Sequence, residues 1–240
     1  MEIDEIKADE EYAEKLWHEA REFGCMPDTL EPYPEDKTFT QYMLDEPAKK
    51  YPNELAVVCL DREMTWKELK EQVDRFANAL ANLGVKKGDV VGTYLQSSIQ
   101  WLIADLAIPE AGAVHMPMSP LESADSLIDK VERTKCQAIV CSHTNVKDRD
   151  VIDKVKEAKE RTGLLKNIIL TKIEDYTSNP PEHEEEGVIW FTDLIEKYPP
   201  NPPKVDIDPK KDLVYVYFTG GTTGRPKGVM LTHYNIIACS

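Results

Sequence analysis

The residues best suited to chemistry lie near the end of the chain, in a segment rich in threonine and glycine. The segment runs from Thr219 to Gly228 and has the sequence T-G-G-T-T-G-R-P-K-G. Glycines lack a Cβ atom and let backbone N–H groups turn toward a ligand, while threonine hydroxyls add further donors. Because Lys227 places a positive charge beside these donors, the segment predicts a loop that binds a polyphosphate.

Two well-known phosphate-binding patterns do not fit this segment. The P-loop pattern G-x-x-x-x-G-K-[ST] fails because Arg225 and Pro226 stand where its second glycine belongs. The dinucleotide pattern G-x-G-x-x-G does not match the segment either. The competing interpretation is a surface turn without a function, but ten specified positions after an apolar run favour a binding loop.

The loop comes at the end of an alternating series of apolar and amphipathic segments. A six-residue apolar run, residues 213–218, directly precedes it and predicts a fully buried strand. Further strands are expected at residues 56–60, 90–95, 114–118, 137–141 and 167–171. Helices are expected between them at residues 66–83, 98–110, 123–134 and 148–162. This alternation predicts an α/β fold, with a mostly parallel sheet covered by helices on both faces.

Several of the expected helix ends are marked by local sequence signals. Residues 65–68 (T-W-K-E) form a capping box at a helix start, and Gly84 stands where the residue after that helix belongs. The residues just before the box, 61–63, are expected to form a turn. Thr38 is predicted to cap an earlier helix that ends at Pro47 or Tyr51.

Other stretches are expected outside this alternation. Residues 174–187 are acidic and predict a solvated loop, and the proline-rich residues 199–203 predict a stiff connector after a short helix at 192–197. An amphipathic helix is expected at residues 8–23. We therefore expect a helical arm at 1–37 and an incomplete main domain at 38–240.

The composition excludes several classes of protein. The 240 residues are 41% hydrophobic and 30% charged, as in an ordinary soluble globular protein. A net charge of −15 argues against nucleic acid as the main partner. The sequence has no apolar run of membrane-spanning length and no signal-peptide pattern at its start. The five cysteines are scattered, which predicts reduced thiols in a cytoplasmic protein and argues against a zinc site.

The segment from Thr219 to Gly228 closely resembles the phosphate-binding signature of the adenylate-forming, or AMP-binding, superfamily, [ST]-[SG]-G-T-T-G-x-P-K-G. The form with Gly220 and Gly221 is most similar to long- and medium-chain fatty-acyl-CoA synthetases. Residues 64–69, 88–91 and 111–117 also resemble early elements of that family, in the same order. The resemblance covers residues 38–240.

The resemblance implies an acid–CoA ligase that forms AMP. Such an enzyme uses ATP to convert a carboxylic acid, here a fatty acid, into an acyl-adenylate and then transfers the acyl group to coenzyme A. Mg²⁺ would bridge the phosphates, although the resemblance assigns no metal ligand in this chain. The residues expected to cradle the β- and γ-phosphates are Thr219, Gly220, Gly221, Thr222, Thr223, Gly224 and Lys227.

Two residues keep a structural alternative beside the functional one. Lys227 would lie near the phosphates as a cation, but it could equally shape the loop. His233 stands where related ligases place a histidine near the acyl site, and a histidine at a helix start without such a role fits the same position. Pro226 restricts the backbone at the loop exit.

The resemblance also implies that the chain is an N-terminal portion. Complete members of the family are more than twice as long, and their adenylation lysine lies in a C-terminal domain. No catalytic residue is therefore expected within these 240 residues. The alternative is a non-catalytic module that binds a nucleotide or a partner, and uncovered sheet edges would favour homo-oligomers.

Overall fold

A computed structural model describes residue 15 and residues 33–143, 151–220 and 226–239. The chain divides into two compact units, residues 1–34 and 35–240, and the elements discussed below belong to the second. The helix expected at residues 8–23 falls outside the described residues except for Lys15. It stays a prediction, as does the boundary between residues 37 and 38.

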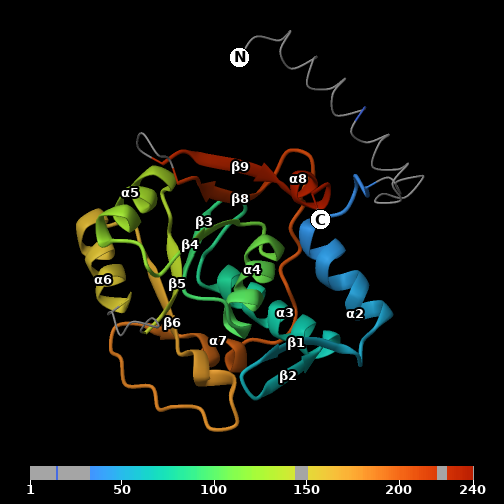
Figure 1. Cartoon of the computed structure of the whole chain (residues 1–240), viewed down its shortest axis with the longest axis horizontal. Coiled ribbons are helices and arrows are strands. Elements are labelled where there is room, and N and C mark those ends of the chain that lie inside the picture. The colour runs from blue at the N-terminus through green and yellow to red at the C-terminus, as the bar shows by residue number, and fades with distance from the viewer. Residues whose placement is uncertain (1–14, 16–32, 144–150, 221–225, 240) are drawn as a thin grey trace. The chain divides into compact units, whose positions relative to one another are not determined.

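A seven-stranded sheet forms the centre of the second unit, in the order β7-β6-β5-β3-β4-β8-β9 (Figure 1). All its pairings are parallel except one, because β9 runs antiparallel to β8. The prediction of a mostly parallel sheet is confirmed. The strands are β3 (Val90–Tyr94), β4 (Val114–Met118), β5 (Ala138–Ser142), β6 (Asn167–Thr171), β7 (Ile189–Trp190), β8 (Leu213–Phe218) and β9 (Gly228–Thr232).

Helices cover both faces of this sheet. Successive side chains of β5 point to opposite faces, so Ala138 and Val140 join the core under α3, α4 and α7. Ile139 and Cys141 join the second core, under α5 and α6. A strand buried on both faces has a continuous apolar sequence, which is how β5 was predicted. The helices are α3 (Trp66–Asn82), α4 (Ile99–Glu110), α5 (Ala124–Thr134), α6 (Val151–Thr162) and α7 (Phe191–Lys197).

The capping signals in the sequence are confirmed. Thr65 Oγ1 accepts a hydrogen bond from the Glu68 amide, and the Thr65 amide donates to Glu68 Oε2. Gly84 follows the end of α3 with a positive φ of 88°, a conformation that glycine adopts without strain. These contacts fix both ends of α3.

The helix expected after Thr38 also forms, with one irregular turn. Thr38 Oγ1 accepts from the Gln41 amide, and a π-helical turn, η1 (Gln41–Asp45), leads into α2 (Glu46–Lys50). Pro47 lies inside α2 and does not end it. Proline has no N–H to donate to a carbonyl of the preceding turn. The wider π-helical turn directly before Pro47 accommodates this missing hydrogen bond.

The turn that was expected at residues 61–63 lies earlier, at Leu60 and Asp61. Strands β1 (Leu55–Cys59) and β2 (Arg62–Thr65) form an antiparallel hairpin, and the chain reverses at Leu60, which has a φ of 54°. Arg62 and Glu63 belong to β2. The sequence hid this strand because Met64 is its only buried residue, which leaves too short a pattern to detect.

The strand before the threonine-glycine loop has the predicted bounds, but it is not fully buried. Tyr217 in β8 is 39% exposed, and Phe218 is half-buried. The next strand, β9, was not revealed by the sequence. It lies at the edge of the sheet, and its Val229 and Met230 are exposed.

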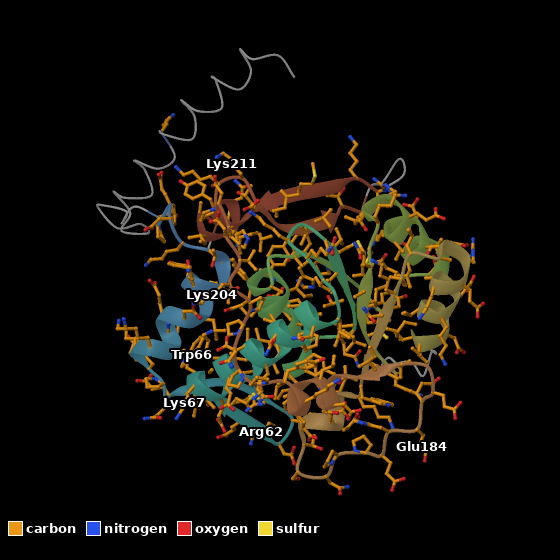
Figure 2. All side chains as sticks on the ribbon, turned by 180° about the vertical axis from the view of Figure 1, so that it is seen from behind. Arg62, Trp66, Lys67, Glu184, Lys204 and Lys211 are labelled. Atoms are coloured by element: carbon orange, nitrogen blue, oxygen red, sulfur yellow. The ribbon has the colours of Figure 1, made fainter. Side chains whose placement is uncertain are left out.

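The acidic segment 174–187 and the connector follow the prediction in outline. The segment begins with a short 3₁₀ helix, η2 (Ile173–Tyr176), and Glu184 lies on the outside of the loop that follows (Figure 2). Asp175 is an exception, because it is buried and accepts hydrogen bonds from Thr171 and Lys172. Residues 199–203 have no helix or strand.

Two further expectations concern the cysteines and membrane spans. Cys136 and Cys141 are buried free thiols, and burial raises the pKa of Cys136 to about 12. Among the helices that the structure describes, none has both the length and the apolar character needed to cross a membrane.

Candidate functional site

The carboxyl ends of three neighbouring strands define the candidate site. Strands β3, β4 and β8 are parallel neighbours, so the residues that follow them emerge at one edge of the sheet. The chain continues from β3 into α4 on one face and from β4 into α5 on the other. Adjacent strands whose connections leave on opposite faces create a crevice, the usual place for a ligand in a parallel sheet.

A cavity of about 340 Å³ lies at this crevice. Most of its lining comes from the two segments that follow β3 and β4, and Trp101 of α4 adds a large apolar wall. The cavity is therefore a mostly apolar recess with a few polar groups at its rim, which is the usual character of a small-molecule site. Its lining residues are Leu95, Gln96, Ser97, Trp101, Ser119, Pro120 and Leu121.

The threonine-glycine loop joins β8 to β9. The Thr219 amide donates to the Lys227 carbonyl at 3.0 Å, so the two arms of the loop are closed against each other at its base. Lys227 and Thr219 are exposed. No described atom lies within 4 Å of the place where a Cβ on Gly220 would stand, so the backbone there is open to a ligand.

The structure brings together three of the seven predicted phosphate-binding residues, namely Thr219, Gly220 and Lys227. The other four, Gly221, Thr222, Thr223 and Gly224, lie outside the described residues, as does Arg225. The described donors are a hydroxyl, backbone N–H groups and an ammonium, which suit an anion and not a metal ion. Among the residues that the structure describes, no group of three or more His, Cys, Asp or Glu residues could hold a metal.

Sequence analysis missed a buried polar network beneath the site. His115 of β4 contacts Asp105 of α4 through Nδ1 at 2.9 Å and Thr93 of β3 through Nε2 at 2.8 Å. The Tyr215 hydroxyl donates to the same Asp105 oxygen at 2.7 Å. Because a carboxylate only accepts, the proton on the His115 ring lies on Nδ1. We call these four residues the Asp105 network.

The Asp105 network joins the strand of the loop to the rest of the sheet. His115 and Tyr215 are also the register pair between β4 and β8. Burial, together with the neighbouring Asp105 carboxylate, raises the pKa of Tyr215 well above its usual value, so its hydroxyl stays protonated. A signal was present in the sequence, since Asp105 interrupts an otherwise apolar helix and His115 an apolar strand.

His233 has a structural partner. It is 1% exposed at the start of α8 (His233–Ile237), and its Nδ1 accepts a hydrogen bond from the Phe39 amide at 3.0 Å. Burial lowers the pKa of His233 to about 4, which keeps Nδ1 free to accept. The contact ties α8 to the helical segment after Thr38, and the placement of His233 near an acyl site stays a prediction.

A second polar cluster lies at the opposite, amino edge of the sheet. Lys70 of α3 sits among three carboxylates: Asp45 at 3.1 Å, Glu110 at 3.5 Å, and Asp74, which is bonded to it directly. Burial raises the pKa of Glu110 to about 7. Burial opposes the charge on Lys70, but the carboxylates outweigh it and raise that pKa to about 12.

This Lys70 cluster borders a cavity of about 450 Å³. Asp45 and Glu110 contribute to the wall, and Lys204 closes another side next to η1 (Figure 2). Within the described residues, Glu110 Oε2 is buried without a hydrogen-bond partner. The cluster thus holds more negative charge than Lys70 neutralises.

Comparisons with known proteins connect this geometry to a family. A family model described as AMP-binding enzyme matches residues 44–240. The chain is 32% identical over 186 residues to a medium/long-chain-fatty-acid–CoA/3-oxocholest-4-en-26-oate–CoA ligase of Mycolicibacterium smegmatis, covering 77% of this chain and 31% of that protein. It is 30% identical over 184 residues to an acetyl-coenzyme A synthetase of Rubrobacter xylanophilus, covering 73% and 28%.

A solved structure has the same fold. The crystal structure of the anthranilate CoA ligase AuaEII in complex with anthranoyl-AMP matches with a TM-score of 0.73 at 21% identity. The match covers 84% of this chain and 36% of that one. The chain therefore spans about a third of the length of the relatives that it matches.

Proposed function

The chain belongs to the family of AMP-binding enzymes, and from that membership we propose that it is the ATP-binding N-terminal portion of an AMP-forming acid–CoA ligase. The observation that carries the proposal is the position of the loop. Thr219 and Gly220 directly follow β8, at the carboxyl end of that strand, and the backbone bond from Thr219 to Lys227 closes the base of the loop. Hydroxyl, amide and ammonium donors gathered in one loop suit the phosphates of a nucleotide.

We propose the following roles for the residues of the loop. Thr219, Thr222 and Thr223 donate through their hydroxyls, Gly220, Gly221 and Gly224 donate through their backbone amides, and Lys227 adds positive charge. When a carboxylate attacks the α-phosphorus of ATP, pyrophosphate leaves and gains negative charge. Donors already in place stabilise that charge without reorganisation.

The cofactors follow from the same proposal. ATP and coenzyme A are the co-substrates, and Mg²⁺ would be held mainly by the phosphates, whose charge it neutralises. The acid substrate is proposed to be a fatty acid, on the strength of the two-glycine loop and the named specificity of the Mycolicibacterium relative. A cytoplasmic location and homo-oligomers stay predictions from the sequence.

One experiment tests the binding role of the loop. Isothermal titration of MgATP into the chain should give a saturable affinity, and the double substitution Thr222→Ala and Thr223→Ala should weaken it more than tenfold. The control pair is Thr177→Ala with Thr192→Ala, on a surface loop and on α7. Equal affinities for both pairs would exclude the proposed phosphate contacts.

The alternative is a module that binds a nucleotide or a partner without catalysis. ATP–pyrophosphate exchange with a panel of fatty acids separates the two functions. Exchange by a longer product of the same gene, with no exchange by the 240-residue chain, supports the ligase. MgATP binding without exchange in either form supports the module.

A further inference from the structure

The base of the threonine-glycine loop contacts the end of α5. We define the loop neck as Phe218 and Thr219 on the entering arm and Pro226 and Lys227 on the leaving arm. One backbone hydrogen bond joins the arms, from the Thr219 amide to the Lys227 carbonyl. Phe218 and Gly228 pair in the hairpin below it, beside α5 (Figure 1).

Arg133, near the end of α5, contacts both arms of the loop neck. Its Nη1 donates to the Pro226 carbonyl at 2.7 Å, on the leaving arm. Its guanidinium carbon lies 4.9 Å from the centre of the Phe218 ring, on the entering arm. A planar guanidinium can make both contacts at once, because its N–H groups lie in the plane and its face stacks on an aromatic ring.

The surroundings of Arg133 hold it in place. Asp129, one turn earlier in α5, pairs with Arg133 Nη1 at 3.2 Å. Lys130 is 6% exposed, lies 5.3 Å from the Phe218 ring centre and is bonded to Glu122. Glu122 also accepts from Ser126 at 2.6 Å. The Phe218 ring therefore meets two cations that are already fixed on α5.

From these contacts we propose that Arg133 is a positioning residue, which sets the distance between the two arms of the loop neck and so orients the phosphate-binding residues. This inference rests on the proposed function of the loop. The Pro226 carbonyl can accept from any N–H donor, but a guanidinium can donate to it in its own plane while its carbon lies over the Phe218 ring. Lysine would keep the charge and lose this pair of contacts.

Hydrogen exchange measured by mass spectrometry tests the inference without a ligand. Arg133→Met and Arg133→Lys should both speed exchange about tenfold in peptides that cover residues 213–220 and 226–232, while peptides from β5 and β6 keep their rates. The matched control is Arg161→Met on α6, which removes an exposed, ion-paired arginine. Unchanged exchange at the loop neck, or an equal rise throughout the sheet, would overturn the inference.

Titration with MgATP and with magnesium pyrophosphate adds the functional readout. Arg133→Met and Arg133→Lys should each weaken binding about tenfold, and Arg161→Met should leave it unchanged. Full recovery of affinity in Arg133→Lys would show that charge alone acts, and it would overturn the positioning role. If the unaltered chain binds neither ligand, the proposed function fails, while the exchange rates still decide whether Arg133 holds the neck.

Discussion

The buried Asp105 network and the partly buried Lys70 cluster differ in how their charges are neutralised. In the Asp105 network one carboxylate accepts from both His115 and Tyr215, so a single charge receives two hydrogen bonds. In the Lys70 cluster three carboxylates share one ammonium. A buried charge is tolerated when hydrogen bonds replace its water, and the second cluster does not provide enough of them. The second cluster should make the stability of the fold depend on pH, because its Glu110 has a pKa raised to about 7.

The largest effect is expected from Asp105→Ala. The substitution leaves the His115 N–H and the Tyr215 hydroxyl buried without an acceptor, which should lower the free energy of unfolding by about 4 kcal/mol. Urea unfolding at pH 7 measures it. Asp125→Ala, which removes a carboxylate that is 84% exposed, should change stability by less than about 0.5 kcal/mol. Similar losses in the two variants would mean that the network adds no stability.

Lys70→Met should come next, and its effect should depend on pH. Without the ammonium, three carboxylates lie together, so the free energy of unfolding should fall by about 3 kcal/mol at pH 8. At pH 5 the loss should be smaller, because Glu110 is then protonated. Urea unfolding at both pH values measures the difference. Arg75→Met, on the same helix, removes the pair with Glu71 and the hydrogen bond to the Tyr198 carbonyl, and the loss should show no such dependence. The same loss at pH 5 and pH 8 would rule out excess charge in this cluster.

Glu110→Gln should stabilise the protein at alkaline pH. The pKa of Glu110 is raised in the folded state, from 4.5 to about 7, so the folded state holds the proton more tightly than the unfolded state. The stability that protonation gives is present below pH 4.5 and is lost as the pH rises through 7. The variant, which cannot ionise there, should gain about 2 kcal/mol over the native chain between pH 5 and pH 8. Urea unfolding of both chains at four pH values measures the difference. If the free energy of unfolding changes with pH equally in both chains, Glu110 does not have the raised pKa.

Tyr215→Phe should have the smallest effect and the flattest pH profile. It removes one hydrogen bond to Asp105 and keeps the aromatic packing, so the expected loss is about 1 kcal/mol at pH 5 and at pH 8. Tyr217→Phe, on the same strand with an exposed ring, is the control. Combined with Asp105→Ala, Tyr215→Phe should add almost nothing, because the two residues share one interaction. If the two losses of unfolding free energy add fully in this double-mutant cycle, Asp105 and Tyr215 stabilise the fold independently and the network is contradicted.

Much of the fold could be predicted because single segments carry its signals. A strand such as β5 is apolar throughout, and α3 has a capping box at one end and a glycine after the other. The strands that were missed, β2, β7 and β9, are four, two and five residues long, which is too short for a clear pattern.

The residues of the candidate site also differ in how far their own segment of sequence predicts them. The composition of the threonine-glycine loop was enough to predict a phosphate site, because glycine and threonine suit an anion wherever they stand together. The role proposed for Arg133 could not be predicted, since nothing in the sequence of α5 shows that Pro226 and Phe218 come to lie against it. The Asp105 network is intermediate. Its polar residues interrupt apolar segments, but their partners lie on four different elements.

The contacts that hold the loop's strand also have a consequence for the order of folding. The Asp105–Tyr215 bond joins residues 110 positions apart, and the Phe39–His233 bond joins residues 194 apart. Contacts that close long stretches of chain form slowly, whereas the β8–β9 hairpin needs only its own neighbours. We therefore expect the hairpin to form early as an isolated unit and to join the sheet last. The end of the domain that carries the proposed nucleotide site would then be its final part to become native, and under that proposal a nascent chain would bind ATP only after that step.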